Sequence, residues 1–181
     1  LSKQLVGQVE LHSNFADDLN DYNGLLSITL DDKVAFYNLD NPIIPALLFE
    51  LNIDNAINSG QKITENQNHY IVEKNQLYVL NYTESSEFEI IAVRTLDDLS
   101  SNDNSHSYQV NIDQGSLFIQ QVEVTYSSNV EEKNYVVSEY DINDLNDIKL
   151  LSKATTPVEL LSPHLAYLGQ NHFALSTQDS V

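Results

Sequence analysis

Clusters of asparagine, aspartate and serine interrupt the apolar segments of this chain at short intervals. Three of the clusters lie at residues 20–24, 100–105 and 143–147. These side chains form hydrogen bonds with nearby backbone groups, and Asn and Asp tolerate left-handed conformations, so the clusters predict turns. Turns that recur after about 8 to 12 residues leave room only for short elements, a spacing typical of a sandwich, a barrel or a propeller.

The segments between the turns have the pattern of β-strands. Their apolar residues alternate or form short runs, and β-branched and aromatic residues are enriched among them. About a dozen strands are expected, at residues 25–30, 34–39, 46–51, 69–72, 76–81, 88–94, 108–112, 116–126, 134–140, 148–153, 165–168 and 172–176. In residues 116–126 the alternation changes phase at Gln120 and Gln121, which predicts a β-bulge. Single helical turns are expected at residues 15–19, 54–57 and 157–161.

Four places in the chain combine an apolar strand, a polar turn and a second apolar strand. They lie at residues 30–42, 69–81, 134–143 and 164–175. Asp40, Asn81 and Asp141 serve as anchors for aligning three of them, with spacings of 41 and 60 residues. The first spacing is close to one propeller blade, and the second fits a blade with an insertion at residues 95–115. This pattern predicts repeated hairpins.

Residues 70–81 and 40–45 resemble the LVIVD-type repeats of bacterial β-propellers. In those repeats, a hairpin of Tyr-Val, a turn and Leu-x-Val-hydrophobic-Asp precedes a proline pair and another strand. Here residues 70–81 supply the hairpin, and residues 40–45 supply the proline pair. The resemblance implies an all-β chain forming a β-propeller or propeller fragment of about four four-stranded blades. From the residues alone, an antiparallel β-sandwich built from ordinary meanders is the alternative.

The length and composition predict one all-β domain spanning residues 1–181. The chain is 41% hydrophobic and contains 10 Tyr and 6 Phe, which is enough apolar material to form a core. It begins at Leu1 and contains no Met, so we expect a segment of a longer secreted or surface protein. The expected location is extracytoplasmic, meaning periplasmic, cell-surface or secreted.

The charge and the lack of cysteine exclude several classes of function. The chain has 27 acidic and 8 basic residues, and Arg94 is its single arginine. Nucleic acids and anionic membranes both require basic patches, so neither is an expected partner. No apolar run is long enough for direct membrane insertion. Without cysteine, the chain forms no disulfide, thiolate nucleophile, Cys-ligated zinc site or iron–sulfur cluster.

The sequence contains no recognisable catalytic or metal-binding motif. Residues 141–147 resemble a calcium loop, but an EF-hand requires Gly and Glu where this chain has Asn146 and Ser152, so an Asx-rich turn is the interpretation. The five histidines have no metal-ligand spacing. They are His12, His69, His106, His164 and His172. We therefore predict no catalytic residues, no metal ligands and no cofactor, and the sequence leaves the ligand-binding residues unknown.

These observations favour a non-catalytic binding domain that presents loops on a β scaffold to a protein or polysaccharide partner. One alternative is a carboxylate-dependent hydrolase that acts on glycosides through two acids in a cleft. No sequence feature selects such a pair, so an enzyme is the less favoured hypothesis. Another alternative is a structural fragment of a larger extracellular protein, which would expose an apolar sheet face or an open edge.

Overall fold

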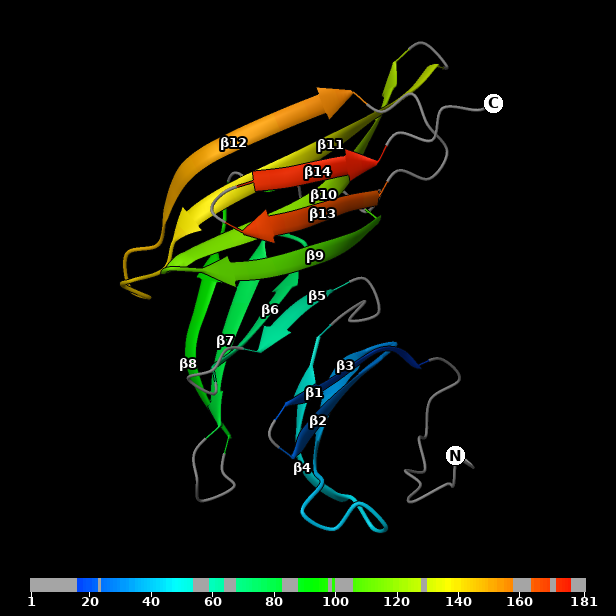
Figure 1. The fold of residues 1–181 in the computed structure, drawn as a ribbon, viewed down its shortest axis with the longest axis vertical. Coiled ribbons are helices and arrows are strands. Elements are labelled where there is room, and N and C mark those ends of the chain that lie inside the picture. Colours follow the sequence, from blue (N-terminus) through cyan, green and yellow to red (C-terminus); the bar gives the residue numbers. More distant parts are fainter. Residues whose placement is uncertain are drawn as a thin grey trace. The chain divides into compact units, whose positions relative to one another are not determined.

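The computed structural model of the chain describes residues 16–22, 24–53, 59–63, 68–82, 88–97, 99, 106–127, 130–157, 164–169 and 172–176. Every secondary-structure element in these residues is a β-strand, so the all-β prediction is confirmed (Figure 1). No helix among the described residues has the length and apolar character needed to cross a membrane.

The described residues form antiparallel sheets in which strands that follow one another in the chain are neighbours. The strands are β1 (Ala16–Tyr22), β2 (Leu25–Leu30), β3 (Lys33–Asn38), β4 (Ala46–Asn52), β5 (Gly60–Ile63), β6 (Asn68–Glu73), β7 (Gln76–Tyr82), β8 (Phe88–Thr95), β9 (His106–Asp113), β10 (Ser116–Ser127), β11 (Val130–Asp141), β12 (Lys149–Pro157), β13 (His164–Gly169) and β14 (His172–Ser176). The sheet orders are β1-β2-β3-β4, β5-β6-β7-β8, β9-β10-β11-β12 and β13-β14, and these sheets form no closed barrel.

Each strand expected from the sequence overlaps an observed strand, while β1 and β5 were not expected. The helical turn predicted at residues 15–19 is wrong, because β1 pairs with β2 and places Leu19 opposite Ile28. Of the other two, residues 54–57 lie outside the described part, and Pro157 ends β12, with the rest of that segment also outside. The predicted bulge is confirmed, since the pairing of β10 with β9 shifts between Gln120 and Val122.

The chain divides into two compact units. Residues 1–73 and 77–94 form the first, and residues 74–76 and 95–181 form the second. The core of the first unit joins side chains of β2, β3 and β4 to side chains of β6 and β7. Its buried members are Leu25, Val34, Phe36, Leu51, Ile53, Ile71 and Leu80. Partly buried aromatic residues, including Phe49 and Phe88, pack against this cluster.

Phe36 is the centre of an aromatic group within that core. Its ring centroid lies 4.6 Å from the ring of Phe88, 6.1 Å from Phe49 and 5.0 Å from His69, which it meets edge to face. Tyr82 lies 5.0 Å from Phe88. Because β3, β4, β6, β7 and β8 all contribute, this group holds the two sheets of the first unit together.

In the second unit, the β9–β12 sheet is buried on both faces at its centre. Leu117 and Phe118 are neighbours on β10, so their side chains point to opposite faces, yet they are 0% and 1% exposed. Three buried polar residues, Gln120, Gln121 and Ser138, lie among the apolar ones.

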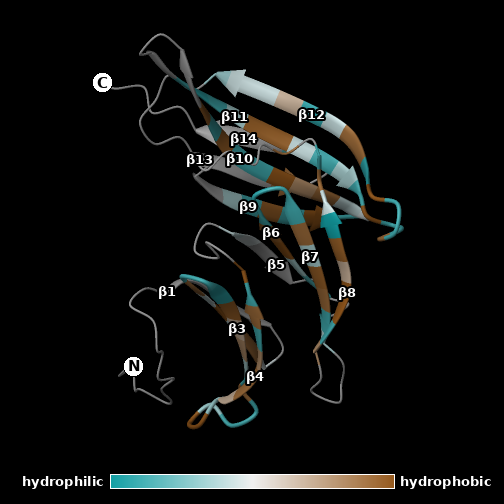
Figure 2. Cartoon of the chain, turned by 180° about the vertical axis from the view of Figure 1, so that it is seen from behind, coloured by the Kyte–Doolittle hydropathy of each residue, from teal (hydrophilic) through white to brown (hydrophobic). Residues whose placement is uncertain are grey.

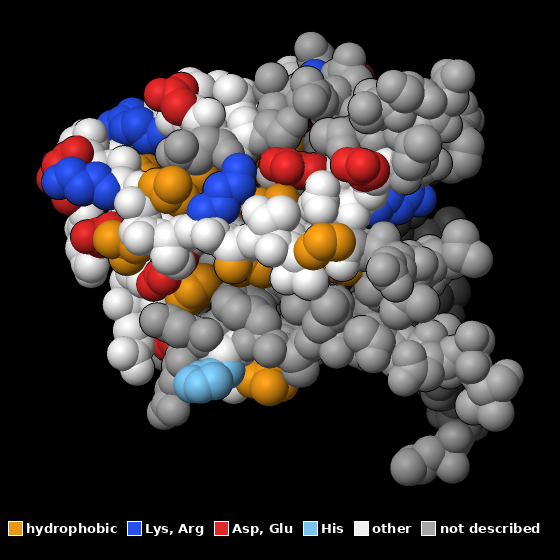
Figure 3. Space-filling model, turned by 90° about the horizontal axis from the view of Figure 1, so that it is seen from above, with side chains coloured by type: hydrophobic (Ala, Val, Ile, Leu, Met, Phe, Trp, Pro, Cys, Tyr) orange, Lys and Arg blue, Asp and Glu red, His pale blue; other side chains and the backbone are white. Residues whose placement is uncertain are grey.

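The last strand of each four-stranded sheet is mostly exposed. Residues of β4, β8 and β12 are mostly exposed, whereas β2, β3, β6 and the middle of β10 are mostly buried. In the first unit, the exposed β8 carries a hydrophobic stretch like its neighbour β7 (Figure 2). Figure 3 looks onto the side where β12 lies in Figure 1 and shows apolar side chains scattered among acidic and basic ones. The exposed strands still carry large apolar residues, namely Leu47, Ile90, Ile91, Val93 and Leu151.

Candidate functional site

The β3–β4 loop, residues 39–45, is held in shape by two asparagine side chains. Asn38 Oδ1 accepts a hydrogen bond from the backbone N–H of Asp40 at 2.6 Å, and Asn38 Nδ2 donates to Asp40 Oδ2 at 3.0 Å. Asn41 Oδ1 accepts from the backbone N–H of Ile43 at 3.2 Å. Such Asx turns satisfy backbone groups that would otherwise need water or a partner strand, so the loop's own residues order it.

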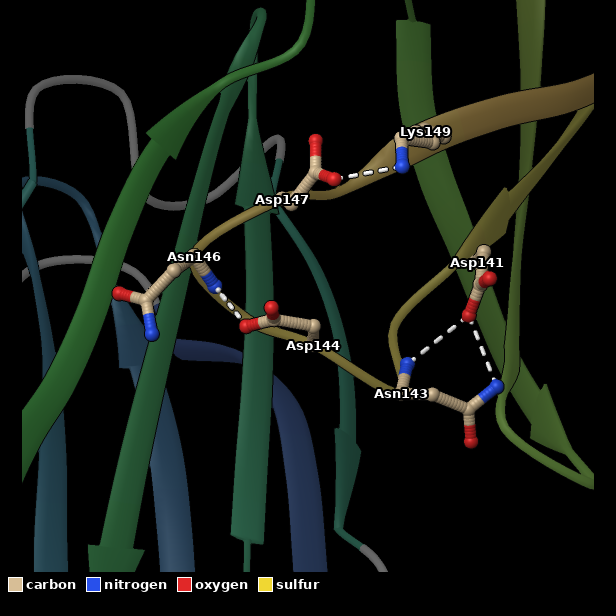
Figure 4. Close-up of polar contacts among 6 residues, drawn as sticks. All are labelled: Asp141, Asn143, Asp144, Asn146, Asp147 and Lys149. Carbon is tan, nitrogen blue, oxygen red and sulfur yellow. Dashed lines mark hydrogen bonds and ion pairs between the residues drawn. The ribbon is translucent and has the colours of Figure 1, made fainter.

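The β11–β12 loop, residues 142–148, repeats this arrangement (Figure 4). Asp141 Oδ1 accepts from the backbone N–H of Asn143 at 3.0 Å and from Asn143 Nδ2 at 2.8 Å. Three residues further on, Asp144 Oδ1 accepts from the backbone N–H of Asn146 at 2.9 Å. The Asx-turn interpretation of this segment is therefore confirmed.

The two loops also start from the same strand register. Asn38 pairs with Ala46 across the β3–β4 loop, and Asp141 pairs with Lys149 across the β11–β12 loop, so both loops have the same length. Behind each loop the pairing slips between the second and third residue pairs. The position equivalent to Asp141 is thus Asn38, two residues before the Asp40 chosen as an anchor from the sequence.

A glycine in a tight turn lies directly behind each loop. The carbonyl of Gly24 accepts from the N–H of Leu39 at 2.6 Å, and the carbonyl of Gly115 accepts from the N–H of Ile142 at 2.9 Å. Both glycines have positive φ, +79° and +84°. Since a side chain is strained in this region, glycine suits both turns.

The tips of the two loops differ in their side chains. In the β3–β4 loop, Ile43 and Ile44 are 65% and 71% exposed. The equivalent positions of the β11–β12 loop are occupied by Asn146 and Asp147, which are also exposed. Figure 2 shows the apolar stretch of the first loop between hydrophilic ones. The shared turn therefore does not require apolar residues at these positions.

The charges of the β11–β12 loop are engaged in local contacts. Hydrogen bonds from the backbone and side chain of Asn143 hold the pKa of Asp141 below its ordinary value. Lys149 Nζ lies 2.5 Å from Asp147 Oδ2, and this contact raises the pKa of Lys149. The described part of the chain contains no group of three or more His, Asp or Glu side chains placed to hold a metal ion.

Glu139 joins three strands of the second unit through serine hydroxyls. Its Oε1 accepts from Ser116 Oγ on β10 at 3.1 Å, and its Oε2 accepts from Ser152 Oγ on β12 at 2.9 Å. Each hydroxyl donates its single proton to the carboxylate. We interpret this group as a polar bridge across the sheet rather than a nucleophile with its base.

Among the histidines, His69 is buried in the aromatic core, where burial lowers its pKa from 6.5 to about 3. His106, His164 and His172 begin β9, β13 and β14, and His172 is exposed. His12 lies outside the described residues. The structure therefore brings none of the described histidines into a metal-binding group.

The buried His69 predicts a loss of stability in acid. Its pKa is lower in the folded chain than in the unfolded chain, where it is about 6.5, so the unfolded state binds more protons below that pH. The stability is therefore present above pH of about 6.5 and is lost as the pH falls toward about 3. Going from pH of about 6 to 5, wild type should lose about 1 kcal/mol more than His69→Phe. Urea unfolding at both pH values measures this, and equal losses in the two proteins would contradict it.

The exposed isoleucine pair was not singled out from the sequence as a candidate site. Its signal was nevertheless present, since Ile43 and Ile44 stand between Pro42 and Pro45 inside a segment rich in Asx residues. Apolar residues in a turn have no core to enter, and two together are therefore informative.

No family model, curated protein or solved structure matches this chain.

Proposed function

We propose that this chain is a non-catalytic binding domain that presents ordered loops to a protein partner. The observation that supports this function best is the β3–β4 loop, whose own hydrogen bonds hold it in shape while Ile43 and Ile44 remain in solvent. An ordered loop loses little conformational entropy on binding. Burying its two apolar side chains against a partner releases water and favours the complex.

The scaffold we propose is a β-propeller or a fragment of one, with the LVIVD-type repeats as its relatives. Three observations support this proposal. Strands follow chain order within each sheet, the last strand of each four-stranded sheet is mostly exposed, and equivalent loop contacts occur in the first and third sheets. In such a scaffold the loops of successive blades gather at the two ends of the ring.

A protein fits the exposed loop better than a polysaccharide does. A sugar hydroxyl that leaves water needs a new hydrogen-bond partner, and losing one is costly. Ile43 and Ile44 offer only hydrocarbon. An apolar pocket on a protein is the complementary surface, because it also gains from leaving water.

The exposed residues of β8 favour a second candidate function, that of a structural segment packing against other parts of a larger protein. Ile90, Ile91 and Val93 are 45%, 39% and 44% exposed. Within the described residues, β8 has β7 as its single neighbour in the sheet. An open edge with apolar side chains is a surface on which another strand can pair.

Selection from a phage-displayed random peptide library on the immobilised chain tests the binding function. We expect enriched peptides whose binding is competed by the soluble chain. Lack of enrichment over a blank surface would contradict a protein-binding role. Nitrophenyl glycosides, incubated with the same chain, supply the test of catalysis, and their turnover would contradict a non-catalytic domain.

A further inference from the structure

We propose that Ile43 and Ile44 insert into an apolar pocket of the partner whose rim carries lysine or arginine. This inference rests on the proposed binding function and names the loop and the chemistry of the partner. The β11–β12 loop, with the same turn and a polar tip, takes no part in this contact.

The fold does not account for the exposed isoleucine pair. The β11–β12 loop makes equivalent hydrogen bonds with Asn146 and Asp147 at the same positions. In both loops the N–H of the fourth residue of the second Asx turn donates to a backbone carbonyl, at 3.1 Å from Ile44 to Asn41 and 3.0 Å from Asp147 to Asp144. Exposed apolar side chains that the turn does not require indicate a binding role.

The isoleucine pair is held in place before binding. Pro42 and Pro45 flank it, and their rings restrict the backbone on either side. The Asx bonds of Asn38 and Asn41 order the rest of the loop. Leu47, the second residue of β4 and three residues after Ile44, is a further apolar side chain that is 52% exposed. We call Ile43, Ile44 and Leu47 the apolar tip.

The chain around the apolar tip is acidic. Residues 38–49 contain Asp40 and no lysine or arginine, and the formal net charge of the chain is −19. A partner with basic residues around its pocket is attracted and oriented by the negative electrostatic potential of this chain. A second copy of this chain has the same acidic charge, so like charges oppose self-association through this loop.

A selected peptide, made synthetically, tests this inference. Its affinity for the wild-type chain is compared with that for Ile43→Asn/Ile44→Asp, which gives the first loop the tip of the second. The affinity should fall by about 100-fold or more, because two buried isoleucines are lost. Asn146→Ala/Asp147→Ala is the matched control and should change it by less than about threefold.

The selected peptides should also combine apolar residues with lysine or arginine. Their affinity should fall between about 50 and 500 mM salt, because screening weakens the attraction of opposite charges. Selected peptides that lack basic residues, or affinities insensitive to salt, would overturn the basic rim. Peptides that bind the Ile43→Asn/Ile44→Asp chain as well as wild type would overturn the loop assignment and leave the binding function standing.

Two control measurements establish that the affinity loss comes from the loop and not from unfolding or self-association. Thermal unfolding should give Ile43→Asn/Ile44→Asp the midpoint of wild type, since both side chains are exposed. If it does not, Ile43→Ser/Ile44→Ser replaces it, with the same affinity loss expected. Sedimentation should show a single copy, whereas a dimer that this loop variant dissociates would show that the occupant is a second copy and overturn the basic partner.

Discussion

Replacing Phe36 with alanine should lower the free energy of unfolding by about 3 to 5 kcal/mol. The Phe36 side chain is fully buried, and its ring contacts those of Phe49, His69 and Phe88. The variant loses this burial, leaves a cavity, and removes aromatic pairs that are each worth about 0.5 to 1.5 kcal/mol beyond burial. A domain is stable by about 5 to 15 kcal/mol, so the loss is a large share of the total.

Urea unfolding followed by far-UV circular dichroism measures the effect of Phe36→Ala. Leu47→Ala is the control, because Leu47 is 52% exposed and its truncation should cost about 0.5 kcal/mol or less. If the two variants were equally stable, Phe36 would not be at the centre of the core of the first unit.

The second large effect is expected for Gly115→Ala, at about 2 to 4 kcal/mol. At a φ of +84°, an alanine pays a conformational cost of about 1 to 2 kcal/mol. Its Cβ would also lie 2.9 Å from Cγ of Asn143, which the hydrogen bond to Asp141 holds in place. Moving that side chain breaks the hydrogen bond from Asn143 Nδ2 to Asp141 Oδ1, which supports the first Asx turn of the β11–β12 loop.

Gly24→Ala is the matched control for the Gly115 variant. Its φ of +79° is similar, but the nearest atom to a new Cβ is Asp40 Oδ1 at 3.7 Å, an ordinary contact. We expect only the conformational cost there, about 1 to 2 kcal/mol. Adding Asn143→Ala to the Gly115 variant should reduce its cost to that of Gly24→Ala. Equal costs for the two single variants would contradict the close approach at Gly115.

The sequence was sufficient to locate most of the observed strands, both buried and exposed, and insufficient for β1 and β5. In β1, Ala16, Leu19 and Tyr22 are spaced by three residues, which imitates a helix. Pairing with β2 decides the conformation instead, placing Ala16 opposite Leu30. Such tertiary pairing overrides a weak local preference.

The candidate site was predictable in its turns and not in its side chains. The segment from Asn38 to Asn41 contains three Asx residues, and any of them could begin a turn. The strand register and the hydrogen bonds of the structure show that Asn38 is equivalent to Asp141. Likewise, whether Ile43 faces solvent or a core depends on the neighbouring sheets, which no local pattern specifies.

The most direct test of a binding domain that acts through its ordered β3–β4 loop is to map a selected peptide on the ¹⁵N-labelled chain by amide chemical shifts. We expect the largest shifts at residues 39–45, with residues 142–148 unchanged. Shifts centred on β8, residues 88–95, would instead support the structural segment that packs through its open edge. That outcome, or shifts on the β11–β12 loop, would contradict the assignment of binding to the β3–β4 loop.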